Sequence, residues 1–172
     1  MIVHEKVYDA FLDGLKAAIT RFQIGNPLDR DTTHGPMSSL RAMELALDQT
    51  AEAVKGGATL VAGGKRMDRK GFFMEPTILT DVSKDNPVFY QEIFGPVAVV
   101  HKVASEQAAI DLANDSPYGL GGAVFSRDIA RAEKVAEQVE TGMVFINTAT
   151  AAAPELPFGG IKNSGFGREL SF

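Results

Sequence analysis

Apolar residues recur every three or four positions near the start of the chain, which predicts an amphipathic helix over about residues 7–22. Gly25 and Pro27 follow this stretch, and neither residue type continues a helix well. The residues expected to share the buried face of this first helix are Val7, Phe11, Leu15, Ile19 and Phe22.

A second helix is predicted to begin at Ser38 or Ser39, because a serine side chain can accept a hydrogen bond from the first turn. It would end at Gly56–Gly57 and be followed by a strand at Thr59–Ala62. Residues Pro76–Thr80 are expected to be extended and to lie at a sheet edge, where a proline is tolerated. The apolar positions of the second helix are Leu40, Met43, Leu47 and Val54.

The second half of the chain alternates between strand and helix patterns. Val97–Val100 is a β-branched, apolar run typical of a strand that is covered on both faces. The elements predicted after it are a helix from Ser105 to Asn114, a strand at Gly122–Phe125, a helix from Asp128 to Thr141–Gly142, and a strand at Met143–Asn147. Such an alternation predicts the α/β class, with an open, mostly parallel twisted sheet and flanking helices.

Composition narrows the classes of function. The chain has 172 residues, with 17 basic and 22 acidic side chains and a net charge of −5, and apart from a basic surface loop at 65–70 its cations are scattered. We therefore expect no nucleic-acid partner. No apolar run reaches the ~18 residues needed to cross a membrane, and the first residues do not resemble a secretory signal. The expected location is the cytoplasm, with no membrane partner.

The sequence contains no cysteine. This excludes a disulfide framework, a cysteine-ligated metal and a thiol nucleophile supplied by this chain. His4, His34 and His101 lack the spacing of a metal site. We therefore expect no metal.

The predicted strand–helix turns do not favour a self-contained dinucleotide-binding fold. Such a fold needs glycines where a strand meets a helix, so that a pyrophosphate can approach the helix N-terminus. The two turns here, residues 103–105 and 125–128, contain no glycine, and Asp128 would repel a phosphate.

The stretch Glu92–Pro96 precedes the Val97 strand and allows two interpretations. It can be a turn that feeds the strand, in which Gly95 permits the bend, Pro96 fixes φ and Phe94 fills a gap in the core. It can also be a ligand site, in which the Glu92 carboxylate accepts hydrogen bonds from a vicinal diol and Phe94 forms an apolar wall beside a flat ring.

Residues 157–169 are too rich in glycine for regular secondary structure. Gly159, Gly160, Gly165 and Gly167 fall within nine residues. We expect an ordered loop that is held by close backbone contacts or lies against a ligand. Ser164 has no histidine near it in the sequence and is expected to hydrogen-bond the backbone rather than to act as a nucleophile.

Three motifs together resemble the NAD(P)-dependent aldehyde dehydrogenase superfamily. They are Glu-x-Phe-Gly-Pro at 92–96, Asn-Asp-Ser-Pro-Tyr-Gly-Leu at 114–120 and Pro-Phe-Gly-Gly-x-Lys-x-Ser-Gly-x-Gly-Arg-Glu at 157–169. Their order and separation match the catalytic domain of that family, and the resemblance runs over essentially the whole chain. The ending at 165–171 is most similar to the succinate-semialdehyde dehydrogenase branch.

The resemblance implies roles for individual residues. Glu92 would bind the hydroxyls of the nicotinamide ribose of NAD or NADP, and Phe94 would pack near the nicotinamide ring. Phe158 would line the substrate tunnel, and residues 148–156 would form the variable loop that shapes it. Small side chains such as Ala152 would leave that tunnel open to a small-molecule aldehyde.

The departures from the family pattern are as informative as the match. The family's nucleophilic cysteine, general-base glutamate and dinucleotide-binding domain would all precede Ile2, and a terminal strand region that helps to build a homo-oligomer would follow Ser171. Gln91 stands where many relatives have a second glutamate. Residues 1–172 are therefore expected to be one domain, the C-terminal part of a catalytic domain, with no catalytic residue of its own and no activity alone.

The full-length parent would oxidise an aldehyde, with succinate semialdehyde as a candidate, to the carboxylic acid with NAD(P). One alternative is a natural non-catalytic protein that keeps this fold for binding or association. Another is a related reductase that uses a different acyl acceptor. Because the missing partners would leave apolar surface uncovered, the isolated chain is expected to self-associate.

Overall fold

The computed structural model describes residues 1–171, and the chain divides into two compact units, unit 1 (Met1–Val103) and unit 2 (from Ala104 onward). The assignment of residues 1–172 to one domain stays a prediction. Unit 1 contains β1 (Ile2–His4), α1 (Glu5–Ile19), α2 (Leu40–Lys55), β2 (Thr59–Ala62), β3 (Thr77–Thr80) and β4 (Val97–Val103). Unit 2 contains α3 (Glu106–Asn114), β5 (Tyr118–Gly119), β6 (Gly121–Val124), α4 (Ile129–Ala136), β7 (Met143–Ile146) and β8 (Ile161–Lys162).

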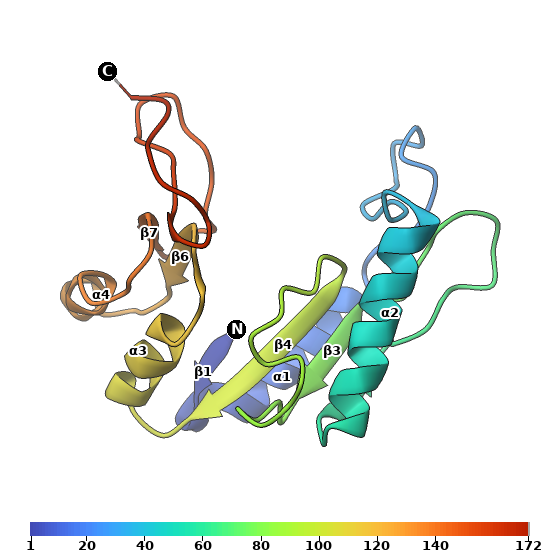
Figure 1. Cartoon of the computed structure of the whole chain (residues 1–172), viewed down its shortest axis with the longest axis horizontal. Helices are drawn as coiled ribbons and strands as arrows, with labels where there is room; N and C mark the ends of the chain where they lie inside the picture. The colour runs from blue at the N-terminus through green and yellow to red at the C-terminus, as the bar shows by residue number, and fades with distance from the viewer. Residues whose placement is uncertain (172) are drawn as a thin grey trace. The chain divides into compact units, whose positions relative to one another are not determined.

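Unit 1 is built on a four-stranded sheet with the order β1-β4-β3-β2 (Figure 1). β4 runs parallel to both β1 and β3, and only β2 is antiparallel to its neighbour. The predicted α/β class, with a mostly parallel open sheet and flanking helices, is confirmed.

The two long helices of unit 1 cover opposite faces of this sheet. On one face, Ile78 and Val100 pack with Tyr8, Leu12 and other residues of α1. On the other face, Leu79 packs with Ala53 of α2. Because successive side chains of a strand point to opposite faces, the neighbours Ile78 and Leu79 of β3 place α1 and α2 in separate layers.

Local sequence signals set the starts of three helices. The side chains of Ser39, Ser105 and Asp128 each accept a hydrogen bond from the backbone N–H three residues ahead, at 3.1, 3.1 and 3.0 Å respectively. These are N-caps, which satisfy a donor that the helix itself cannot pair. They begin α2, α3 and α4, as the sequence predicts.

The prediction that Pro76–Thr80 lies at a sheet edge is wrong. β3 lies between β2 and β4, and all four of its residues are buried. Pro76 precedes the strand and so costs it no donor. Thr77 is satisfied in the interior because its N–H donates to Pro96 O (2.8 Å) and its hydroxyl donates to Glu75 O (2.8 Å).

The buried face of α1 also differs from the predicted one. Tyr8, Leu12, Leu15 and Ile19 contact the sheet, whereas Val7 is 57% exposed and Phe11 38% exposed. Phe22 lies beyond the helix and is 42% exposed. Apolar residues at 7, 8, 11, 12, 15 and 19 form a stripe broader than one contact surface. Periodicity alone cannot show which edge of such a stripe meets the sheet.

The buried face of α2 differs from the predicted one in a similar way. Leu40 and Val54, which were expected to be buried, are partly exposed. The buried residues of this helix are Met43, Ala46, Gln49, Thr50 and Ala53.

Unit 2 contains a β6–α4–β7 segment in which β6 and β7 pair in parallel, and β5 pairs with β8 antiparallel. The predicted strands therefore do not share one sheet, because β4 belongs to the four-stranded sheet.

Helix α4 ends at Ala136, before the predicted Thr141–Gly142. Gln138 and Val139 then donate to carbonyls three residues back, so a tight turn continues the helical spacing that the sequence displays. Among the described residues, no helix has the length and apolar character needed to cross a bilayer.

Candidate functional site

The segment Glu92–Pro96 lies in unit 1 and leads into β4. Glu92 is exposed and Phe94 is 77% exposed, whereas Ile93 between them packs inward against two clusters of buried residues. Phe94 therefore does not fill a gap in the core, and that part of the turn interpretation is wrong. The partly buried side chain of Ile93 thus holds the segment, while the Glu92 carboxylate and the Phe94 ring point outward.

This segment is hydrogen-bonded to β3 and packs closely on α2. The N–H of Gly95 donates to Ile93 O at 2.9 Å, and Pro96 O accepts from Thr77 of β3 at 2.8 Å. A methyl group on Gly95 would lie 3.0 Å from Ala46 Cβ, which is tighter than nearly all real contacts of this kind. Glycine at 95 and alanine at 46 therefore let the loop approach the helix.

Gln49 of α2 is a site residue that the sequence analysis missed. It is 8% exposed, and its Nε2 donates to Gln91 Oε1 (2.9 Å) and to the main-chain oxygen of Glu92 (3.3 Å). A glutamine on the buried face of an amphipathic helix was the available signal, because buried polar side chains need partners. Its partners lie more than forty residues away in the sequence, so only the fold identifies them.

In unit 2, the glycine-rich stretch 157–169 is an ordered loop closed by main-chain hydrogen bonds. Phe158 and Glu169 exchange two of them, at 2.8 and 2.9 Å, and β8 within the loop pairs with β5. The main chain of the half-buried Phe158 is thus fixed by its two hydrogen bonds to Glu169. Ala152 precedes the loop in an irregular stretch and is exposed.

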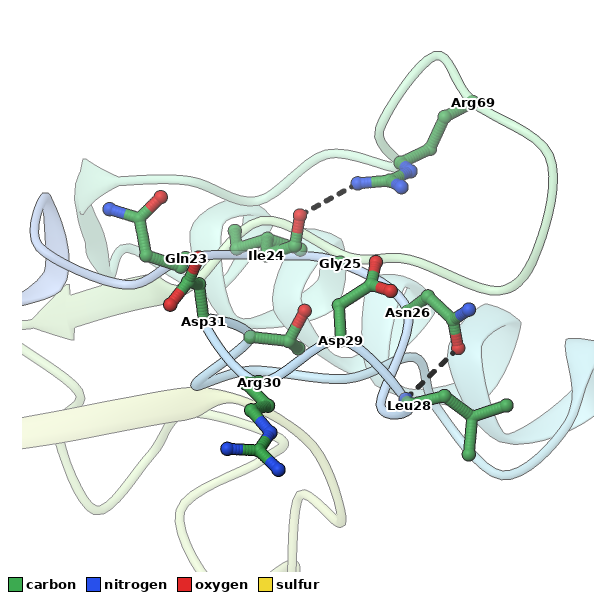
Figure 2. Close-up of a pocket in the computed structure, with 10 residues that line it drawn as sticks. Gln23, Ile24, Gly25, Asn26, Leu28, Asp29, Arg30, Asp31 and Arg69 are labelled. Carbon is green, nitrogen blue, oxygen red and sulfur yellow. Dashed lines mark hydrogen bonds between the residues drawn. The ribbon is translucent and has the colours of Figure 1, made fainter.

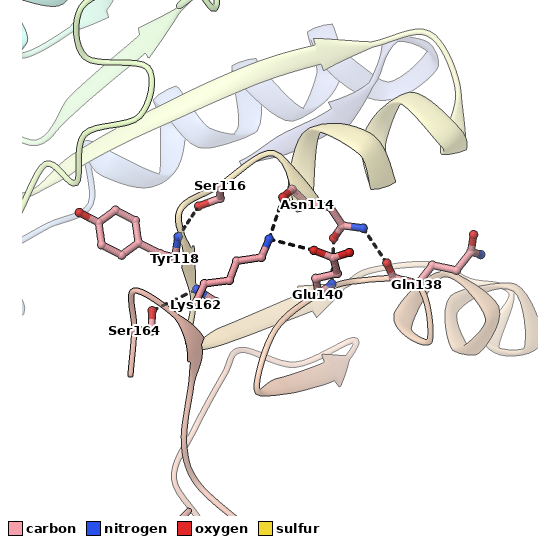
Figure 3. A network of polar contacts seen from close by, with 8 residues as sticks. Asn114, Ser116, Tyr118, Gln138, Glu140, Lys162 and Ser164 are labelled. Atoms are coloured by element: carbon pink, nitrogen blue, oxygen red, sulfur yellow. Dashed lines mark hydrogen bonds and ion pairs between the residues drawn. The ribbon is translucent and has the colours of Figure 1, made fainter. Parts of the chain in front are cut away.

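Side chains join this loop to the motif at 114–120 (Figure 3). Lys162 Nζ donates to Asn114 O (2.8 Å) and forms an ion pair with Glu140 (3.0 Å), while the Asn114 amide bonds the main chain at 138 and 140. Ser164 Oγ accepts from the N–H of Gly119 at 3.0 Å, so the prediction that Ser164 bonds the backbone is confirmed. The two motifs form one polar cluster within unit 2.

Glycines permit backbone contacts in the loop that no other residue would allow. A methyl group on Gly142 would lie 2.7 Å from the carbonyl carbon of Gly159 and closer still to its oxygen. Gly165 and Gly167 have φ of 98° and 93°, which residues with a Cβ rarely adopt. The expectation of a loop held by close backbone contacts is confirmed.

The four predicted site residues divide between the two units. Glu92 and Phe94 belong to unit 1, and Phe158 and Ala152 belong to unit 2. The segment carrying the first two is anchored on α2, and the half-buried Phe158 is fixed in the glycine-rich loop. Their roles toward a ligand remain predictions.

A polar hollow of about 690 Å³ is lined by the connection between α1 and α2 and by Arg69 (Figure 2). Its wall includes Asp29, Asp31 and Arg69, and the Arg69 guanidinium donates to Ile24 O at 2.8 Å. None of the four predicted site residues lines this hollow. The described residues also contain no group of three potential metal ligands among histidine, aspartate and glutamate.

A family model described as the aldehyde dehydrogenase family matches residues 1–171. The chain belongs to the aldehyde dehydrogenase family. The succinate-semialdehyde dehydrogenase [NADP(+)] of Deinococcus radiodurans is 50% identical over 171 residues, which is 99% of this chain and 36% of that protein. The similarity to the succinate-semialdehyde dehydrogenase branch is thereby confirmed.

Solved structures of this aldehyde dehydrogenase family share the fold closely. The structure described as giving insights into cofactor and substrate selection by Gox0499 is 99% identical with a TM-score of 0.98, and the match covers 99% of this chain and 38% of that chain. Succinic semialdehyde dehydrogenase from Streptococcus pyogenes in complex with NADP+ is 51% identical with a TM-score of 0.96, over 99% of this chain and 37% of that one.

A betaine aldehyde dehydrogenase from Staphylococcus aureus in complex with NAD+ is 40% identical with a TM-score of 0.94, over 99% of this chain and 35% of that one. This chain therefore spans little more than a third of the length of the aldehyde dehydrogenases it matches.

Proposed function

We propose that this chain is the C-terminal part of the catalytic domain of an NAD(P)-dependent aldehyde dehydrogenase that oxidises succinate semialdehyde to the carboxylic acid. The similarity of the whole chain to succinate-semialdehyde dehydrogenases at 40–50% identity supports this substrate class. The sequence contains no cysteine, so a thiol nucleophile has to come from residues outside it. The chain alone is therefore expected to be inactive.

The exposed pair Glu92 and Phe94 is the observation that carries the cofactor part of the proposal. Glu92 is exposed, so its carboxylate oxygens are accessible as acceptors. An ionised carboxylate can accept from both hydroxyls of a ribose, and charge-assisted bonds of this kind are the strong ones. Phe94, two residues further along the chain and 77% exposed, offers an apolar face. This chemistry fits the sugar and ring of a nicotinamide nucleotide.

The bound cofactor would supply the hydride acceptor of the oxidation. The residues of this chain would bind and orient it. Glu92 would fix the ribose through hydrogen bonds, and Phe94 would limit the movement of the ring beside it. The succinate-semialdehyde relatives are named for NADP(+), and the betaine aldehyde relative binds NAD+, so both dinucleotides belong in the test.

On the substrate side, Phe158 would form part of the wall of the aldehyde tunnel, and Ala152 would keep the tunnel wide. Phe158 is suited to this because its backbone is closed against Glu169, which fixes the side chain's origin. Ala152 is exposed, so a larger side chain can be introduced there without disturbing a core. Homo-oligomerisation and a cytoplasmic location also stay predictions.

The test requires a full-length enzyme in which residues 1–171 replace the matching segment of the Gox0499 protein. Glu92→Gln removes the charge at constant shape and is expected to raise the Kd for NAD(P)+ about tenfold, within the range for bonds to charged groups. Glu44→Gln makes the same change on the exposed face of α2 and serves as the matched control. Equal cofactor affinity of Glu92→Gln and its control would refute the role of Glu92.

The role of Ala152 is tested by Ala152→Phe in the same enzyme. We expect kcat/KM for succinate semialdehyde to fall relative to that for a smaller aldehyde, with the Kd for the cofactor unchanged. An unaltered preference among aldehydes would count against a tunnel position for this residue.

A further inference from the structure

We propose that Gln49 of α2 is a positioning residue for the cofactor, because it fixes the main chain at Glu92 and thereby the carboxylate that receives the ribose. This inference rests on the proposed function of Glu92. Gln49 itself would touch no cofactor atom. Its action would pass through the backbone of the segment that carries Glu92 and Phe94.

Two main-chain oxygens determine the orientation of the Gln49 amide. Pro87 O acts through the side chain of Gln91, and Glu92 O acts directly. Pro87 O accepts from Gln91 Nε2 at 2.8 Å, so the side-chain oxygen of Gln91 faces Gln49 and needs a donor. Glu92 O is a second acceptor on the same side, at 3.3 Å from Gln49 Nε2. A carbonyl oxygen can only accept. The NH₂ group of Gln49 therefore points toward the loop, and its oxygen points away.

That oxygen is an unusual feature of the core. Gln49 is 8% exposed, and its Oε1 is the one fully buried side-chain oxygen or nitrogen without a hydrogen-bond partner among the described residues. An unpaired buried acceptor destabilises a fold, and a residue such as methionine would fill the same space without that penalty. The Gln49 amide thus makes its hydrogen bonds through the donor side alone, and both are directed at the loop.

The loop needs such a support at this point. Main-chain hydrogen bonds hold it on both sides of Glu92, where Gln91 N donates to Val88 O and Gly95 N donates to Ile93 O. These are local turns within the loop, and the main-chain bond that connects the segment to β3, from Thr77 N to Pro96 O, lies four residues beyond Glu92. Among the described residues, Gln49 is the one group that donates to the Glu92 oxygen.

Helix α2 offers a rigid surface for the whole loop. Asn86 Nδ2 donates to Ala53 O (2.8 Å) at one end of it, and Gly95 lies against Ala46 at the other. Positions 46, 49 and 53 recur at helical spacing on one face. Gln49 is the middle and only hydrogen-bonding side chain of these three, and it meets the loop at the residue that carries the carboxylate.

The test uses the full-length enzyme described above, with the Kd for NADP+ and NAD+ measured by calorimetry and steady-state kinetics measured with succinate semialdehyde. Gln49→Met keeps the volume and removes the donor. We expect the Kd for the cofactor to rise about tenfold, equivalent to 1.4 kcal/mol. The KM for the aldehyde should stay within about twofold, and the melting temperature should stay equal or rise.

Thr50→Val is the matched control on the same helix. Thr50 is 2% exposed, and its hydroxyl donates to Ala46 O at 2.7 Å, a bond internal to α2. This variant is expected to lower the melting temperature and to leave the cofactor Kd unchanged. If Thr50→Val weakens cofactor binding as much as Gln49→Met does, the effect is one of helix stability and the inference is overturned.

The double variant Gln49→Met/Glu92→Gln separates the possible outcomes. If Gln49 acts through Glu92, the two losses of affinity should be clearly less than additive. Full additivity, or an unchanged Kd in Gln49→Met while Glu92→Gln weakens binding, would overturn this inference and leave the proposed function intact. An unchanged Kd in Glu92→Gln would instead refute the ribose role of Glu92 and, with it, the positioning role of Gln49.

Discussion

Alanine at position 142 should be far more damaging than the same substitution at position 14. The Cβ of Gly142→Ala would lie 2.7 Å from Gly159 C and 2.9 Å from Gly160 Cα, below the 3.0 Å that real Cβ atoms essentially never pass. All the atoms it meets are backbone. Gly159 is itself confined on another side, where a methyl group on it would lie 2.9 Å from Arg168 Cδ.

The magnitude follows from overpacking. Inserting a methyl group into a filled site costs typically 1–3 kcal/mol, and the upper end applies because no flexible side chain can move aside. The contact also endangers the hydrogen bond from Gly142 N to Gly119 O (3.0 Å), whose loss would cost about 1 kcal/mol. We expect the free energy of unfolding to fall by about 3 kcal/mol, which lowers the melting temperature by about 6–12 °C.

Gly14→Ala is the matched control. Gly14 lies inside α1, and a methyl group on it meets nothing within 4 Å. Alanine has the higher helix propensity, so this variant should gain about 0.5–1 kcal/mol. The protein has no tryptophan, so circular dichroism during urea and thermal denaturation is the suitable readout. A Gly142→Ala protein as stable as its parent would refute the reasoning, unless hydrogen exchange showed that residues 157–169 alone had opened.

Three further predictions concern caps, the polar cluster and pH. Ser39→Ala removes the N-cap of α2 and should lower the free energy of unfolding, measured by urea denaturation, by about 1 kcal/mol. Ser38 is exposed, and Ser38→Ala should leave that free energy nearly unchanged. Lys162→Met removes the hydrogen bond to Asn114 O and the ion pair with Glu140. It should lower the free energy of unfolding by about 1 kcal/mol and speed amide hydrogen exchange in the loop, and unchanged exchange would contradict this. Burial, and then the N-terminal ammonium, lower the pKa of His101 in the folded chain. As the pH falls, His101 is therefore protonated in the unfolded chain at a higher pH than in the folded chain. The contribution of His101 to the free energy of unfolding should therefore fall as pH drops below about 6.5, and His101→Gln should remove that part of the slope.

The features that the sequence predicted well are those set by neighbouring residues. The caps Ser39, Ser105 and Asp128 act within three residues, and Thr59–Ala62 forms a strand with the predicted bounds. The density of glycines at 157–169 also predicted an ordered loop, because it does not suit regular secondary structure.

The features that the sequence missed depend on partners distant along the chain. β3 is central because β2 and β4 pair with its two sides, which no pattern within residues 76–80 reveals. Tyr8 rather than Val7 faces the sheet because the contact selects one edge of a broad apolar stripe. Gln49 meets Gln91 and Glu92 only after folding. The ligand roles of Glu92, Phe94, Phe158 and Ala152 remain predictions, since they depend on groups that this chain does not contain.

The way the glycine-rich loop is closed has a consequence for its capacity to evolve. Main-chain groups close this loop, where Phe158 pairs with Glu169, and also the chain on either side of it, where Leu156 N donates to Ala153 O and Ser171 N donates to Pro154 O. Such bonds are indifferent to the side chains at 151–153, 155 and 156. A mutational library confined to those positions would therefore vary the side chains of this stretch while its main-chain hydrogen bonds stay the same.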